Sequence, residues 1–341
     1  MKTQRFGIPF LILSLGLVLF FLLNIRLGSV DIPLNAILKS IINDPSVQDS
    51  WRIIVMDFRI PKAITACIAG AGLAISGLFM QTLFRNPLAG PFILGISSGA
   101  SLGVALLILG AGIFGGFLSA MAMEWALPIA ASLGAFLVLL SVLLASNKIK
   151  NTMSILIIGL MFSSFAAAII SVLSYFSEAD KLQQFIFWGF GSLANLSWNQ
   201  VLILSLVFFV ALMYSIRLIK PLNSLLLGEN YAKSLGMNTQ GNRTQILVIT
   251  SLFTGVITAF VGPIAFIGLA VPHIARLVFN SSNHKVLLPS SAILGAIILL
   301  ICDIVAQLPN NEITLPINAI TSIFGAPVVI WLLIKKKKIF I

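Results

Sequence analysis

Few side chains of this 341-residue chain could carry proton or ion chemistry, and the most unusual of them stand among apolar residues. Asp303 follows the uncharged run Ile293–Ile301, and His273 and Arg276 lie just beyond Pro272. A charged group in an apolar interior is costly and often functional, so these three are the candidate interior polar residues. Plainer interpretations are that Asp303 pairs with a neighbouring helix, that His273 is hydrogen-bonded in the interior, and that Arg276 extends toward polar surroundings.

Motifs for catalysis are absent or stand in the wrong context. The chain has no GxxxxGK[ST] phosphate-binding loop, no HExxH and no metal-spaced Cys/His cluster, and it has only two histidines. Gly95-Ile-Ser-Ser-Gly99 matches the GxSxG nucleophile elbow, which requires a strand–turn–helix context and a His/acid pair. An apolar, glycine-rich setting favours a chance match. We therefore expect no enzyme activity, cofactor or metal site, with an intramembrane hydrolase using Ser97 or Ser98 as an alternative.

Two segments contain helix-breaking glycine and proline residues inside otherwise apolar sequence. Phe84–Pro91 reads as a tight link with two prolines, and Gly262–Arg276 has Gly-Pro at its start and Pro-His near its end. Such breaks are tolerated in membrane helices where they line a cavity, so both segments are candidates for a translocation path.

Composition places the chain in a bilayer. Hydrophobic residues make up 59% of it and charged residues 9%, with a mean hydropathy of +1.08. A soluble domain carries about a quarter charged residues. Runs such as Phe6–Leu23 have no charge and approach the ~20 helical residues that span a membrane. The continuous runs exclude a β-barrel, whose strands would alternate in polarity. The net charge of +11 is explained by loop topology and does not indicate nucleic-acid binding.

The sequence predicts an all-α polytopic bundle of about ten transmembrane helices, with residues 1–341 forming one permease-like domain. The expected helices are 6–27, 61–83, 92–111, 125–145, 153–175, 198–218, 243–262, 264–279, 286–307 and 315–334. The eighth is short enough to be a partial span. A small interfacial helix is expected at 177–190, with Trp188 at headgroup level.

Loop charges predict the orientation. On the side of the termini fifteen basic residues stand against one acid, Glu229, whereas the opposite side has six basic residues and eight acids. The excess of Lys and Arg marks the cytoplasmic side, so we expect both termini in the cytoplasm.

Two polar segments are longer than ordinary loops. Residues 28–60 form the expected extracytoplasmic loop, and residues 219–242 form a cytoplasmic segment. Within the latter, Asn223–Gly236 reads as one short amphipathic helix that ends at Gly236. It would either lie on the membrane surface or dock a cytoplasmic partner.

These motifs, taken in order, resemble the FecCD-like permeases, the family of vitamin B12, haem and iron–siderophore importers. The resemblance covers nearly the whole chain. It is carried by Arg59-Ile-Pro-Lys62, Gly70–Gly77, Met80-Gln81, Asn86–Ala89, Gly95–Ala100, Leu227-Gly228, Ala232, Leu235-Gly236, Gly262–Arg276, Leu287–Pro289 and Gly325-Ala-Pro327.

The resemblance implies a type II importer permease in a bacterial cytoplasmic membrane. Two such subunits, as a homodimer (the favoured form) or a close heterodimer, would enclose a central path. Two cytoplasmic ATPase subunits would drive it, and an extracytoplasmic binding protein would deliver the substrate. By motif match, the coupling residues are Leu226, Leu227, Gly228, Glu229, Ala232, Leu235 and Gly236. The cytoplasmic gate residues are Asn86, Pro87 and Leu88, with Thr152 as a second gate, and Arg59 and Lys62 would dock the binding protein.

The chain departs from the family pattern in three places. Lys62 stands where Arg is frequent, Gln307 stands where an arginine often follows the aspartate, and Leu315–Asn318 replaces Glu-Leu-Pro-Val-Gly. The sequence leaves the choice among siderophore, haem and cobalamin substrates open. It also leaves a second class of function, an ion-coupled secondary transporter that would depend on Asp303.

Overall fold

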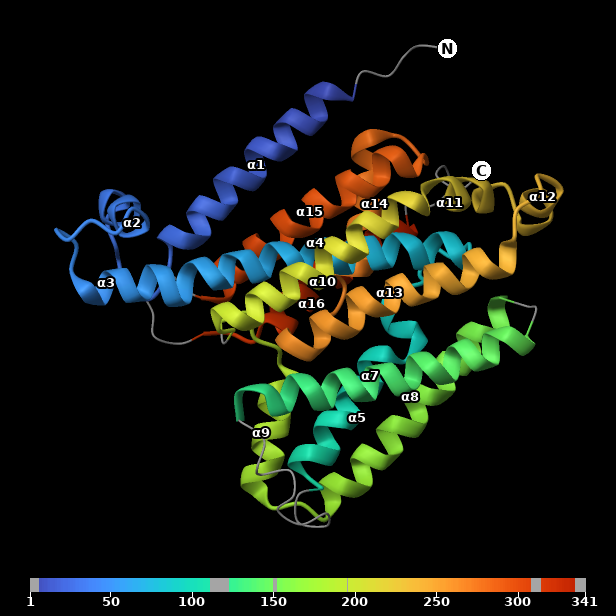
Figure 1. Cartoon of the computed structure of the whole chain (residues 1–341), viewed down its shortest axis with the longest axis horizontal. Helices are drawn as coiled ribbons and strands as arrows, with labels where there is room; N and C mark the ends of the chain where they lie inside the picture. Colours follow the sequence, from blue (N-terminus) through green and yellow to red (C-terminus); the bar gives the residue numbers. More distant parts are fainter. Residues whose placement is uncertain (1–5, 111–122, 150–151, 195, 308–313, 335–341) are drawn as a thin grey trace. The chain divides into compact units, whose positions relative to one another are not determined.

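The computed structural model describes residues 6–110, 123–149, 152–194, 196–307 and 314–334, and all regular elements in these ranges are helical (Figure 1). The chain divides into two compact units. Unit 1 comprises Met1–Ile75, Ser192–Leu206 and Ile264–Ile341, and unit 2 comprises Ser76–Gly191 and Val207–Pro263. The all-α architecture expected from the continuous apolar runs is confirmed.

Unit 1 is built around helices from both ends of the chain. Its elements are α1 (Gly7–Arg26), α2 (Leu34–Ile41), α3 (Asp49–Ile53), the π-helical turn η1 (Ile54–Arg59), the first part of α4 (Ile60–Leu83), the start of α10 (Trp198–Arg217), α14 (Ile267–Phe279), α15 (His284–Ala306) and α16 (Ile317–Ile334). Helix α1 packs on α15, and α14 packs on both α15 and α16.

Unit 2 contains the middle of the chain. Its elements are the end of α4, the 3₁₀ turn η2 (Pro91–Leu94), α5 (Ile96–Ile108), α7 (Met123–Lys148), α8 (Thr152–Tyr175), α9 (Ala179–Gly189), most of α10, α11 (Ile219–Leu226), α12 (Glu229–Ser234) and α13 (Thr239–Val261). Helix α5 packs on α7 and α8, and α7 also packs on α13.

All ten expected transmembrane helices have a counterpart. In the described part of the chain, α1, α7, α8, α10, α13, α15 and the continuous helix Asp49–Leu83 are long and apolar enough to cross a membrane. Helices α5, α14 and α16 are apolar but shorter. Helix α14 is short, as expected, and α9 lies within the stretch 177–190, where the sequence predicts a small helix. Their positions as a partial span and an interfacial helix stay predictions.

Three boundaries differ from the sequence prediction. The second helix begins at Asp49 instead of residue 61. The π-helical turn η1 connects α3 to α4 without a break, because the Ile60 N–H donates to the Val55 carbonyl just before Pro61. The third is broken at Gly95, whose φ is 78°. The single amphipathic helix expected at 223–236 is two helices, interrupted at Gly228, whose φ of 110° only glycine adopts readily.

Close helix contacts in unit 2 depend on small residues. A Cβ placed on Gly134 of α7 would lie 2.1 Å from the Gly99 carbonyl oxygen of α5, and one on Gly103 would lie 2.1 Å from the Ala130 oxygen. These distances leave no room for a methyl group. Gly99 and Gly103, which are four residues apart, therefore form a small-residue packing face against α7.

We predict that Gly134→Ala lowers the melting temperature of the purified protein in detergent, because the added methyl group must push α5 and α7 apart. Overpacking of this kind costs about 1–3 kcal/mol. Gly189→Ala is the matched control, since a Cβ there meets nothing within 4 Å. Equal melting temperatures for the two variants would contradict this account of the α5–α7 contact.

Candidate functional site

The predicted gate residues form a rigid turn after α4 in unit 2. Arg85 adopts a left-handed conformation with φ 48°, and the Asn86 N–H bonds back to the Gln81 carbonyl, so the helix ends abruptly. The Asn86 side-chain oxygen accepts the Leu88 N–H at 2.9 Å, and its backbone carbonyl accepts the Ala89 N–H at 3.0 Å. Asparagine is required here because its side chain closes the turn around Pro87.

The predicted coupling residues lie on α11, α12 and their flanks, also in unit 2. Gly228 makes the bend between the two helices, and Gly236 ends α12 with φ 77°. The Gly236 and Met237 N–H groups bond to the Lys233 and Ala232 carbonyls, which is the hydrogen-bond pattern of a Schellman cap. The expected helix stop at Gly236 is therefore confirmed.

The coupling segment has one buried and one exposed apolar side. Ala232 is fully buried, and Leu222 and Leu225 anchor α11. On the other side Leu227, Tyr231 and Leu235 are 64%, 49% and 59% exposed, and Leu226 is exposed at 36%. Tyr231 and Leu235 are four residues apart on α12 and share one face, and Leu227 lies just before the bend at Gly228. We call these three exposed side chains the coupling stripe. An exposed apolar stripe flanked by the Glu229–Lys233 ion pair has the character of a docking surface.

One cavity joins the gate turn to the coupling helices. It has a volume of about 440 Å³ and lies within unit 2. Its lining residues are Leu83, Phe84, Arg85, Met153, Leu225, Glu229, Thr239 and Arg243. The Arg85 Nη1 atom would lie 3.7 Å from a Cβ on Gly228. A displacement of α12 would therefore act directly on the residue that starts the gate turn.

The buried Arg243 fixes one wall of this cavity. Its guanidinium donates to the Ser146 carbonyl at 2.9 Å and to the Ile149 carbonyl at 3.1 Å, so it joins α13 to the end of α7. Thr152, the second gate candidate, is the first residue of α8, and its side chain lies outside the described part of the structure.

In unit 1, Asp303 is the centre of a buried polar cluster. Its Oδ2 atom accepts hydrogen bonds from Asn24 Nδ2 and Gln307 Nε2, both at 2.7 Å, and lies 3.3 Å from Lys62 Nζ. The cluster joins α1, α4 and α15. The interpretation that Asp303 pairs with a neighbouring helix is confirmed. Gln307 satisfies the carboxylate without adding a second buried cation.

The two predicted docking residues are both engaged inside unit 1. Arg59 is 5% exposed and Lys62 is 9% exposed. The Arg59 guanidinium donates to the Ile25 and Arg26 carbonyls, each at 2.8 Å, and to the Val30 carbonyl, so it caps the end of α1. Docking of a binding protein by this pair stays a prediction, and it would require these contacts to exchange.

The remaining interior candidates lie on one short helix of unit 1. His273 and Arg276 are both half-buried on α14, one turn apart, and Pro272 stands within the same helix. Their functional assignment stays a prediction.

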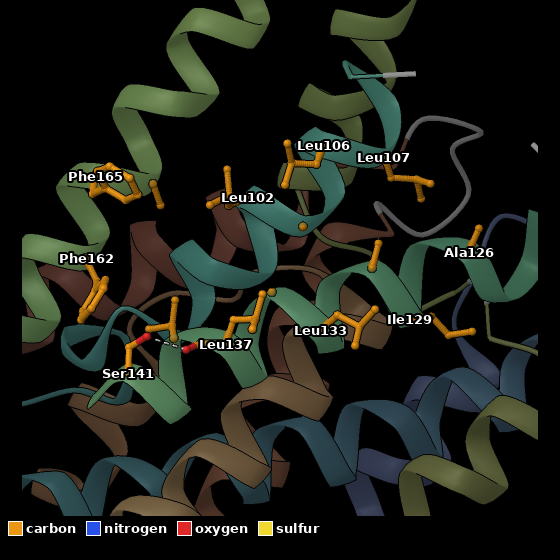
Figure 2. Close-up of a pocket in the computed structure, with 15 residues that line it drawn as sticks. Leu102, Leu106, Leu107, Ala126, Ile129, Leu133, Leu137, Ser141, Phe162 and Phe165 are labelled. Atoms are coloured by element: carbon orange, nitrogen blue, oxygen red, sulfur yellow. Dashed lines mark hydrogen bonds between the residues drawn. The ribbon is translucent and has the colours of Figure 1, made fainter. Parts of the chain in front are cut away.

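A second cavity in unit 2 is an apolar groove of about 470 Å³ between α5, α7 and α8. Figure 2 shows Leu102 and Leu106 of α5, Leu133 and Leu137 of α7, and Phe165 of α8 around it. Among the described residues that line it, Ser141 has the one polar side chain, and that hydroxyl donates to the Leu137 carbonyl at 2.9 Å. The described lining therefore offers no free polar group to orient a polar chelate and is suited to hydrocarbon.

Sequence reasoning missed Asn24, Arg85 and Arg243 as site residues. Asn24 could have been noticed as an amide near the end of an uncharged helix, and Arg85 as a member of the Phe84–Pro91 motif. Nothing in the sequence pattern indicates that Arg243 turns inward to cap α7.

Comparisons with known proteins agree with this architecture. The profile of the FecCD transport family matches residues 16–335. The vitamin B12 import system permease proteins BtuC of Salmonella paratyphi A and Salmonella typhimurium are each 38% identical over 288 residues, which is 84% of this chain and 85% of theirs.

Solved structures give the same result. One described as an inward-facing metal-chelate type ABC transporter has a TM-score of 0.83 at 29% identity, covering 95% of this chain and 98% of its own. A chain of PsaBC from Streptococcus pneumoniae has a TM-score of 0.53 at 16% identity and covers 81% of this chain and 94% of its own, which shows a shared fold alone. With a matched profile over nearly its whole length and relatives above 30% identity, the chain belongs to the FecCD transport family.

Proposed function

We propose that this chain is the membrane-spanning permease of an ATP-binding-cassette importer, and that it carries an iron–siderophore, haem or cobalamin-type substrate into the cytoplasm. Family membership, and relatives named for vitamin B12 import and metal-chelate transport, support this class of function. In this proposal two copies of the chain assemble with two ATPase subunits in the cytoplasm and receive substrate from an extracytoplasmic binding protein.

The observation that carries the proposal is the cavity shared by the gate turn and the coupling helices. ATP binding and hydrolysis in the partner would move α11 and α12 through contacts on the coupling stripe. Because Arg85 borders Gly228, that movement would reach the turn at Asn86 without an intervening element. Alternating access then follows as opening and closing of this turn. The chain itself would perform no covalent chemistry.

In this proposal Arg59 and Lys62 can dock the binding protein only by giving up their present contacts. Carboxylates of a binding protein would compete with Asp303 for Lys62 and with backbone carbonyls for Arg59. Docking would therefore loosen the Asp303 cluster. Because that cluster joins α1, α4 and α15, delivery of substrate would be linked to these three helices.

The coupling stripe supplies the first test. We predict that Leu227→Glu combined with Leu235→Glu reduces co-purification of the ATPase subunits about tenfold or more, because buried hot-spot residues each cost about 2 kcal/mol or more when lost. ATP-driven uptake of labelled ferric siderophore or cobalamin by membrane vesicles should fall in parallel.

Asn230→Glu is the matched control for each of the two substitutions made singly, since it adds one glutamate at an exposed polar position of α12 outside the stripe. It should leave co-purification and uptake near the wild-type level. Full uptake by the double variant, with normal amounts of folded protein, would contradict the coupling assignment.

A second candidate function is an ion-coupled carrier, favoured only by the buried carboxylate of Asp303. Its ion pair with Lys62 and its two amide donors describe a fixed structural cluster more than a proton relay. We predict that Asp303→Asn lowers thermal stability by about 3–5 kcal/mol, because Lys62 is then buried without its counter-charge.

The double variant Lys62→Gln with Asp303→Asn removes both charges and should recover most of that stability, as measured by thermal unfolding in detergent. Because Lys62 is also a docking candidate, the test of ion coupling uses Asp303→Asn alone, and its ATP-driven uptake per folded protein should persist. Uptake by the unchanged chain that a proton or sodium gradient drives, and that Asp303→Asn abolishes, would support the carrier over the importer.

A further inference from the structure

Helix α2 presents three distinct sides to its surroundings. One side is buried in unit 1 and packs on α3 and η1 through Ala36, Ile37 and Ser40. A second side is polar and exposed, with Asn35 and Lys39. The third side is apolar and uncovered, and we call it the α2 stripe. Its members are Leu34, Leu38, Ile41 and Ile42, exposed at 50%, 55%, 48% and 74%.

The spacing of the α2 stripe at i, i+4, i+7 and i+8 places all four side chains on one line along the helix. A row of large apolar side chains facing water is unfavourable, and on a membrane protein it marks a surface that something covers. The elements that support α2 continue this exposure, since Ile53 of α3 is 48% exposed and Phe58 of η1 is 57% exposed.

What covers the stripe is indicated by its position beside α1. Helix α1 is the most exposed of the candidate spans, with 11% of its apolar window buried, so its face belongs to the hydrocarbon of the bilayer. Helix α2 starts eight residues beyond the end of α1 at Arg26, and Figure 1 shows it near that end of α1. The stripe is therefore continuous with a lipid-facing surface.

The linker between the two helices is held in place by Arg59. Its guanidinium binds the Ile25 and Arg26 carbonyls at the end of α1 and the Val30 carbonyl in the linker. This contact fixes the linker to the end of α1 and so holds α2 close to that end. The α2 stripe has no charge that would select a protein partner. The charge of α2 is on the helix's polar side, where Lys39 pairs with Asp44 at 3.9 Å.

We propose that α2 is an interfacial helix whose stripe lies in the boundary between lipid headgroups and acyl chains at the end of α1. Asn35 and Lys39 then face the aqueous side, and Ile37 holds the helix to unit 1. Amphipathic helices of this kind sink about 5–10 Å into the boundary region. The interfacial helix would anchor the end of α1 and the start of α4 to the membrane surface. This role does not depend on how transport is powered.

The test places nitroxide labels on the assembled protein in liposomes, in a Cys67→Ala/Cys302→Ala background. Leu38→Cys and Ile41→Cys report on the stripe, and Lys39→Cys is the control on the polar side. Collision with oxygen and with a water-soluble nickel complex gives a depth parameter for each label. We expect a positive parameter at 38 and 41 and a negative one at 39, without any added binding protein.

A negative parameter at all three positions would place the stripe in water and overturn the proposal. Labels at 38 and 41 that neither reagent reaches, or that become shielded only when the binding protein is added, would assign the stripe to a protein partner and also overturn it. A second measurement keeps both native cysteines: benzoylphenylalanine at position 38 should yield lipid adducts on illumination, and exclusive adducts with protein would refute lipid contact.

Discussion

The bilayer contains no water that could satisfy a polar group, and this constraint explains most of what the chain does with its few polar side chains. Asp303 is buried in unit 1, yet two amide donors and the Lys62 ammonium satisfy it. Arg59 and Arg243 are also buried, and each caps helix-end carbonyls that would otherwise lack donors. Interior charge is thus used at helix ends and crossings.

The same constraint determines where the backbone can be irregular. The breaks at Arg85, Gly228 and Gly262 all have positive φ and all stand at helix ends. Arg85 lines the cavity between the gate turn and the coupling helices, and Gly228 lies beside Arg85, so irregular backbone stands next to a space inside the protein. A transport protein needs parts that can change position, and these breaks concentrate that freedom in a few residues next to the coupling stripe.

Sequence reasoning predicted the all-helical fold and a counterpart for each transmembrane helix, because apolar runs of spanning length have few alternatives. It did not predict the helix at Asp49–Arg59. That segment carries several charged residues, so the sequence predicts a loop, but the π-helical turn η1 accommodates Pro61 and the helix continues into α4. The gate turn was found as a motif, but its internal hydrogen bonds were not. The burial of Arg59 and Lys62 could not be predicted either, because it depends on carbonyls and a carboxylate distant in sequence.

The central claim is that transport by this chain is powered by a separate ATPase and by nothing in the chain itself. The most direct measurement reconstitutes the purified permease in liposomes, with and without its ATPase subunits, and follows uptake of labelled ferric siderophore or cobalamin delivered by the binding protein. The account predicts uptake only when the ATPase and ATP are both present. Uptake by the permease alone, driven by a proton or sodium gradient, would contradict it.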